Sequence, residues 1–285
     1  MKLSVFTVST PDLMPEELVQ AAREAGLHGV EWRFKEIPAE AASEKPSYWR
    51  NNLCSIDPSS TEDELLRFKR ITEAEGLEVA SITPYLNSLD LEETERVFSV
   101  ARLLGAKMIR VGAAGYDGST PYPELYDKTV RYLKEAERLA KQYGVKGVVE
   151  THHLTIAPSA GLAHRLVSHC DPDQIGVLYD PGNMVHEGYE QSKMGLQLLG
   201  PYLAHVHVKN AAWSQAGTRE DGTAAWRCEW SPLADGVIDY SRLLQDLKSV
   251  GYDGYLGIED FSGCYASKEM LRKFAEFISE RMQGR

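Results

Sequence analysis

The chain has 285 residues, 43% hydrophobic and 26% charged, a length and composition that exclude a disordered protein and allow a full hydrophobic core. Its formal net charge of -11 argues against nucleic acid as a partner, because a duplex-binding surface needs clustered positive charge. The sequence contains no run of about 18 apolar residues, so it predicts no membrane span. The four cysteines are too far apart for a C-x-x-C zinc or redox motif.

Short β-rich runs alternate with longer helical patterns from one end of the chain to the other. The start, MKLSVFTVST, is too short and too polar for a signal peptide and predicts a first strand, so we expect a cytoplasmic protein. The predicted strands are residues 2–7, 29–33, 78–83, 107–112, 147–151, 175–180, 204–209 and 255–260. Apolar residues recurring every three or four positions predict helices at residues 15–26, 61–76, 91–106, 126–144, 241–251 and 267–282.

This alternation predicts one (β/α)8 TIM barrel over residues 1–285, without a domain boundary. An open doubly wound sheet is the alternative, but the G-x-G-x-x-G turn that usually follows its first strand is missing. Two connections are unusually long, at about residues 35–60 and about residues 210–239. Both leave the C-terminal end of a strand, where barrel enzymes keep their chemistry, so we expect active-site loops there.

The strand at residues 204–209, AHVHVK, has polar side chains at every second position. Side chains of a barrel strand alternate between the axis and the surrounding helices. Ala204 and the two valines are therefore expected to face the helices, as are the packing residues Trp32 and Tyr179. We expect His205, His207 and Lys209 to face the barrel axis. Burying such polar side chains costs free energy unless each has a hydrogen-bonding or charged partner.

The same alternation turns a carboxylate inward at the end of three of the last four predicted strands, in Glu150, Asp180 and Glu259. Carboxylates packed this closely repel one another unless a cation lies among them. Together with His207 they predict one divalent metal ion. The oxygen-rich donor set favours Mn²⁺ or Mg²⁺, and Co²⁺ or Zn²⁺ are also compatible.

Each of these side chains also has a purely structural explanation. Arg110, inward on the fourth strand, could hold Glu150 in an ion pair, and Asn183 could cap the helix that follows the sixth strand. His205 is interpreted as a hydrogen-bonded core histidine below the site rather than a further ligand. Four groups at the same height in the barrel favour the metal explanation over separate structural roles.

The segments EELVQAAREAGLHGVEWR, VVETHH, YDPGN, HVHVKN and DGVIDYSRLLQDLKSVGYDGYLGIE resemble the xylose isomerase-like superfamily of sugar phosphate isomerases and epimerases. The resemblance covers nearly the whole chain. It implies a metal held by Glu150, Asp180, His207 (the second histidine of HVH) and Glu259, with the two glutamates moving protons on opposite faces of a sugar. Barrels of this family often pair, so a homo-oligomer is compatible, although no surface stripe indicates one.

The chain departs from the ketose epimerases of the superfamily at two points. Those enzymes have a D-x-x-H pattern where this chain has Asp180 and Asn183, and a substrate-binding arginine near the position of Trp213. Arg219 and Arg227 are candidates to replace that arginine. Endonuclease IV, with a trinuclear zinc site, has a histidine where Asn183 stands, and the net charge also disfavours DNA repair.

The resulting hypothesis is a metal-dependent isomerase or epimerase of a keto sugar, in which Glu150 and Glu259 transfer a proton through a stabilised enediolate. A lyase or dehydratase acting on a keto-inositol or 3-keto-glycoside, and a sugar-binding protein without turnover, are the alternatives. Trp49, Arg50 and Trp226 in the long loops could cover the sugar, although loop packing explains them equally well. The residues expected to orient the substrate are His152, Asn183, His186, Lys209, Arg110 and Trp213.

Overall fold

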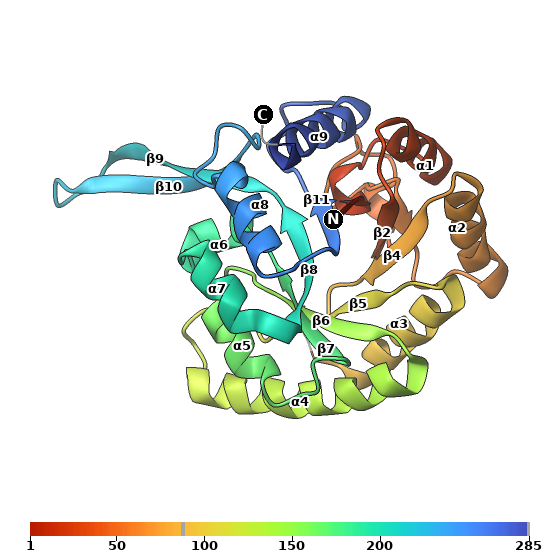
Figure 1. The fold of residues 1–285 in the computed structure, drawn as a ribbon, viewed down its shortest axis with the longest axis horizontal. Coiled ribbons are helices and arrows are strands. Elements are labelled where there is room, and N and C mark those ends of the chain that lie inside the picture. Colours follow the sequence, from red (N-terminus) through yellow and green to blue (C-terminus); the bar gives the residue numbers. More distant parts are fainter. Residues whose placement is uncertain (87–88, 284–285) are drawn as a thin grey trace.

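The computed structural model describes residues 1–86 and 89–283, and its main sheet is a closed barrel of parallel strands (Figure 1). β1 pairs with both β2 and β11, which closes the ring. The predicted (β/α)8 barrel is confirmed, and each predicted strand overlaps an observed one. The barrel strands are β1 (Lys2–Phe6), β2 (Gly29–Phe34), β4 (Glu78–Thr83), β5 (Met108–Val111), β6 (Lys146–Glu150), β7 (Ile175–Tyr179), β8 (Leu203–Val208) and β11 (Tyr255–Ile258).

Helices surround the barrel on its outer side (Figure 1). They are α1 (Pro15–Glu24), α2 (Glu62–Ala74), α3 (Leu91–Leu104), α4 (Tyr122–Tyr143), α5 (Ala160–Val167), α6 (Pro181–Glu187), α7 (Ser192–Leu199), α8 (Tyr240–Ser249) and α9 (Ser267–Met282), with 3₁₀ turns at Thr7–Ser9, Ala39–Ala41 and Gly200–Tyr202. Local signals set their ends: the Thr61 side chain accepts the Glu64 N–H at the start of α2, and Gly105 ends α3 with φ 75°. Among the described helices, none is long and apolar enough to cross a bilayer.

The main hydrophobic core lies between the sheet and the helices. Trp32 is fully buried there and meets the ring of Phe68 edge-on at 4.9 Å, while its Nε1 donates to Thr72 Oγ1 at 3.3 Å. Tyr179 is buried in the same core. Both residues therefore pack on the outer strand face, as the alternation predicts.

A second, small apolar cluster on the inner side of the barrel is formed by Met108, Val148 and Leu178. Ala204 packs against this cluster, so the prediction that it faces the helices is wrong. The reason is a register shift between β7 and β8: Val177 pairs with Leu203 and Leu178 with His205, which leaves Ala204 as an extra residue. One unpaired residue is enough to move a side chain to the other face of a strand.

The long connection after β2 is tied to the barrel rather than free. It contains the two-residue strand β3 (Ser55–Ile56), which extends β2 in parallel. Asn52 is fully buried in it, donating to the carbonyl of Val8 at 3.0 Å and accepting the N–H of Cys54 at 3.0 Å. The loop therefore forms a fixed wall beside the C-terminal mouth of the barrel.

The long connection after β8 is an antiparallel hairpin rather than an irregular loop. Its strands are β9 (Asn210–Thr218) and β10 (Ala224–Ser231), and they extend away from the barrel as an arm (Figure 1). Its base adjoins the C-terminal end of β8, and most of its outer part is exposed. Only the base of this hairpin is close enough to contribute to a site in the barrel.

Candidate metal centre and active-site cavity

Four side chains meet at the C-terminal ends of the last four barrel strands. Glu150 ends β6, Asp180 directly follows β7, His207 lies in β8 and Glu259 directly follows β11. All four are buried, and one possible ligand atom from each lies within 4.8 Å of the others. Because parallel strands end at the same rim of a barrel, the local alternation of each strand is enough to bring these groups together.

The atoms of this cluster fit a divalent cation. His207 Nδ1 lies 3.5 Å from Glu150 Oε1, 3.6 Å from Asp180 Oδ2 and 3.7 Å from Glu259 Oε2. Donors that each lie about 2.1 Å from one ion are separated by roughly 3–3.5 Å. His207 Nδ1 is buried without a hydrogen-bond partner among the described residues, as expected of an atom that ligates a metal.

Lys209 brings a fixed positive charge into the cluster. Its Nζ lies 2.9 Å from Asp180 Oδ2 and forms an ion pair with Glu259, and the side chain is almost fully buried. Nζ also lies over the rings of Trp230 and Phe261, at 4.8 and 5.2 Å from their centres. Lys209 therefore compensates part of the charge of three carboxylates.

The two glutamates of the cluster lie in different electrostatic surroundings. Burial raises the pKa of Glu150, but Arg110 and the nearby histidines outweigh it and hold this pKa well below its ordinary value. Burial also raises the pKa of Glu259, and the other carboxylates add to the effect, so this pKa lies above its ordinary value despite Lys209. The difference arises because Glu150 has a guanidinium of its own, whereas Glu259 shares one lysine with Asp180.

Arg110 forms the ion pair with Glu150 that the sequence allows, with Nη1 2.6 Å from Glu150 Oε2. Its other guanidinium nitrogens donate to the carbonyl of Pro84, at 3.2 Å from Nε and 2.9 Å from Nη2. The guanidinium also lies over the ring of Tyr85, 4.8 Å from its centre. The other oxygen of Glu150 is left to face His207, so the ion pair and the metal explanation are compatible.

Asn183 links the helix after β7 to the cluster. Its backbone N–H is capped by Asp180 Oδ1 at 2.9 Å, so Asp180 itself is the N-cap of α6. The Asn183 side chain reaches back, with Nδ2 3.3 Å from Glu150 Oε1 and 3.2 Å from the carbonyl of Thr151. Asn183 therefore contacts the candidate ligand Glu150, and the cap of α6 is Asp180.

A cavity of about 460 Å³ opens directly above the cluster, large enough for a monosaccharide or a cyclitol. Among the predicted substrate-orienting residues, Arg110, His152, Asn183 and Lys209 line it, together with Glu150 and Glu259. Its aromatic walls are Trp49 from the loop after β2, Tyr85 after β4, Trp230 at the base of the hairpin and Phe261 after β11. Such a mixture of aromatic faces and charged groups suits a polyhydroxylated ligand.

Two predicted substrate-orienting residues lie outside the described lining of this cavity. His186 stacks on His153 at 4.3 Å and lies 4.6 Å from the ring of Trp230, so it supports the wall from behind. Trp213 is half exposed, and its Nε1 donates to the carbonyl of Val185 at 3.0 Å. Their contact with a substrate remains a prediction.

Of the remaining candidate residues in the two long connections, one lines the cavity and the others do not. Trp49 lines the cavity, whereas Arg50 pairs with Glu44 at the surface, 2.8 Å apart, and Trp226 is exposed on the hairpin. Arg219 and Arg227, the candidates for the missing arginine, are exposed on the same hairpin. Within the described chain, none of these last four residues lines the cavity.

Sequence reasoning missed one buried acid that contacts the cluster from below. Glu31 on β2 is fully buried, and its Oε2 lies 3.1 Å from His207 Nε2. Burial raises the pKa of Glu31, but His205 and His207 outweigh it and hold this pKa well below its ordinary value. The signal was present in the sequence, because assigning Trp32 to the outer face turns its neighbour Glu31 toward the axis.

A family model described as xylose isomerase-like TIM barrel matches residues 19–281 of the chain. An inosose dehydratase of Geobacillus thermodenitrificans is 28% identical over 218 residues, covering 67% of this chain and 72% of that protein. Among solved structures, D-allulose 3-epimerase of a Methylomonas species is similar with a TM-score of 0.73 and 15% identity, covering 99% of this chain and 98% of that one. The IolI protein, solved with a zinc atom, is similar with a TM-score of 0.72 and 17% identity, covering 100% and 97%.

Proposed function

The chain belongs to the family of xylose isomerase-like TIM barrels, and from this premise we propose that it is a metal-dependent isomerase or epimerase of a keto sugar or sugar derivative. The observation that carries the proposal is the cluster of Glu150, Asp180, His207 and Glu259 at the floor of the cavity. Three carboxylates and one imidazole that converge beside a cavity form a donor set suited to a divalent metal ion open to a small ligand.

The proposed reaction begins with removal of a proton from a carbon next to a carbonyl group. When bound, the metal supplies Lewis-acid polarisation of that carbonyl, which acidifies the neighbouring C–H bond by several kcal/mol. Glu150, whose pKa is held low, is ionised and suited to accept the proton. Glu259 returns a proton, to the opposite face of the same carbon in an epimerisation or to the neighbouring carbon in an isomerisation.

The other cavity residues position the substrate for this transfer. Lys209 and Arg110 each hold one of the two glutamates and present donors toward the cavity. Asn183 and His152 add polar groups on the wall beside Glu150. The aromatic walls exclude water from the reacting carbon, which strengthens every one of these electrostatic contacts.

A dehydratase is the second candidate, favoured by the similarity to inosose dehydratase. The first proton transfer is the same, but a hydroxyl group then leaves from the next carbon as water instead of the proton being returned. The substrate in that case is a cyclic polyol ketone. The same residues, Glu150 as base and Glu259 as acid, serve both outcomes.

The test is to incubate the purified protein with Mn²⁺ and a panel of ketoses and inososes in heavy water and to follow the products by NMR. Isomers carrying solvent deuterium at the carbon next to the carbonyl support the isomerase or epimerase. An unsaturated ketone formed with loss of water supports the dehydratase. Tight binding without exchange at any carbon would show a sugar-binding protein without turnover and refute both.

The metal proposal is tested separately by elemental analysis of the protein as purified and after reloading. The oxygen-rich donor set favours Mn²⁺ or Mg²⁺, although the similar IolI protein was solved with zinc. We expect one ion per chain. Sedimentation of the loaded protein then tests whether copies of the chain form a homo-oligomer.

A further inference from the structure

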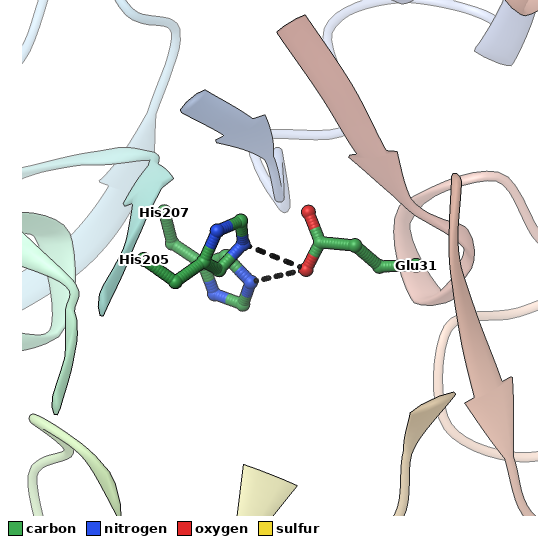
Figure 2. Close-up of side chains that lie close together, drawn as sticks. All are labelled: Glu31, His205 and His207. Atoms are coloured by element: carbon green, nitrogen blue, oxygen red, sulfur yellow. Dashed lines mark hydrogen bonds and ion pairs between the residues drawn. The ribbon is translucent and has the colours of Figure 1, made fainter. Parts of the chain in front are cut away.

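Below the metal cluster, the barrel interior holds a second polar group made of Glu31, His205 and His207. Figure 2 shows the Glu31 carboxylate extending from β2 toward the two imidazoles of β8. All three side chains are fully buried. Glu31 Oε2 lies 3.1 Å from His207 Nε2 and 3.0 Å from His205 Nε2, and its other oxygen accepts the Ser4 hydroxyl at 2.7 Å.

The space that this carboxylate occupies exists because β11 has a glycine at the crossing point. A Cβ added to Gly257 would lie 2.1 Å from Glu31 Oε1 and 3.1 Å from Ser4 Oγ. The first of these distances is far shorter than any real contact of a Cβ atom, so a side chain at position 257 would displace the Glu31 carboxylate. The strands β1, β2, β8 and β11 thus combine to place one acid against the inner edge of His207.

We infer that Glu31 is a positioning residue that fixes His207 for metal binding, an inference that rests on the proposed metal centre. An imidazole has two distinct nitrogens, and a hydrogen bond from one determines which nitrogen keeps a lone pair. Because a carboxylate oxygen accepts, the proton lies on His207 Nε2, and Nδ1 faces the three carboxylates at 3.5 to 3.7 Å.

The orientation of the ring is fixed from a second direction. Phe6 on β1 stacks on the His207 imidazole, with 5.7 Å between ring centres and 19° between ring planes. Stacking holds the plane of the ring, and Glu31 selects which way it is turned within that plane. A carboxylate behind a metal-bound histidine also increases the basicity of the ligating nitrogen, so loss of such a partner typically weakens metal binding about 10- to 100-fold.

The test compares metal binding by the wild-type protein, Glu31→Gln and Glu31→Ala, each stripped of metal and titrated with Mn²⁺ and with Zn²⁺ alone. The matched control is Asp246→Asn, because Asp246 is also a buried acid that accepts a serine hydroxyl, from Ser192 at 2.6 Å, on the outside of the barrel. We expect one ion per chain in all four proteins. The affinity should be unchanged in the control, about 10- to 100-fold weaker in Glu31→Ala, and intermediate in Glu31→Gln.

A spectroscopic signal separates positioning from general loss of structure. In the Co²⁺-loaded wild-type protein, the proton on His207 Nε2 should give a strongly shifted NMR line that exchanges slowly with water, because Glu31 holds it in the interior. The line should persist in Asp246→Asn and disappear or exchange rapidly in Glu31→Ala. Thermal unfolding of the metal-free variants checks that each is folded.

Three results would overturn the inference, and they are distinguishable. A folded Glu31→Ala that keeps wild-type affinity and the slowly exchanging proton refutes positioning alone. Two ions in the wild-type protein, one of them lost in Glu31→Ala, make Glu31 a ligand of a second metal, since the three side chains are close enough to hold an ion. A wild-type protein that binds neither ion refutes the metal centre itself, and with it the proposed function.

Discussion

The two halves of the barrel contribute different chemistry to the same centre. The strands from β6 onward supply the candidate ligands, all at their C-terminal ends. The strands before β6 supply residues that contact those ligands: Glu31 on β2 meets His207, and Arg110 on β5 pairs with Glu150. The difference teaches that a metal centre of this kind depends on partners spread around the whole ring, while the ligand motifs lie in the second half of the sequence.

Removal of a ligand from the second half should have the largest effect. His207→Ala is expected to lose the metal and to lower activity by roughly 10³-fold, because the polarisation of the substrate carbonyl is lost with it. Elemental analysis and turnover of the same preparation measure both. His169→Ala, an exposed histidine on the outside, is the control and should keep its metal. Undiminished metal in His207→Ala would remove this residue from the centre.

The second prediction concerns the close packing of Gly257 on β11 against Glu31 on β2. Gly257→Ala places a Cβ where the Glu31 carboxylate lies, so we expect the free energy of unfolding to fall by about 1–3 kcal/mol. Urea denaturation of the metal-free protein measures the change. Gly161→Ala in α5 is the control, since the added Cβ would meet nothing nearer than 3.8 Å and should be neutral or stabilising. Equal stability of the two variants would contradict the close packing around Glu31.

Substitution of Arg110 tests whether a residue of the first half of the barrel controls the pKa of Glu150 in the second half. Arg110 lowers the pKa of Glu150, so in Arg110→Met that pKa should rise. A base is active only when deprotonated, so the acidic limb of the kcat/KM profile should move to higher pH, with a loss of activity at low pH. Arg102→Met, which removes a surface arginine that donates to the Tyr143 carbonyl, should leave the profile in place. An unshifted limb in Arg110→Met would exclude Glu150 as the titrating base.

The smallest expected effect is a difference in KM between variants of Trp230 and Trp213, the two tryptophans near the base of the hairpin. Trp230 lines the cavity and covers Lys209, whereas Trp213 lies outside the described lining. Trp230→Ala should therefore raise KM about fivefold, and Trp213→Ala should change it less than about twofold. Steady-state kinetics measures both, with the ketose or inosose that turns over in the NMR assay as the substrate. The reverse order would restore Trp213 as the substrate-contacting residue that the sequence suggested.

Local periodicity determined most of the fold. Alternating apolar runs and helical patterns predict the order of strands and helices, and the inward turn of Glu150, Asp180 and Glu259 follows from a period of two within each strand. These groups meet because every parallel strand ends at the same rim, so no long-range information was needed to predict the candidate cluster. The family motifs pointed to the same four residues.

Only the tertiary structure decided what lies between strands. The register shift opposite Val177 and Leu178 turns Ala204 inward, and a shift of one residue leaves no trace in the periodicity of β8. The contact of Glu31 with His207 depends on the closure of the ring and on the gap at Gly257, and the choice of Trp230 over Trp213 depends on how the hairpin leaves the barrel. A sequence encodes which way a side chain faces along its own strand, whereas its partners across the barrel are set by how the strands are staggered when the sheet closes.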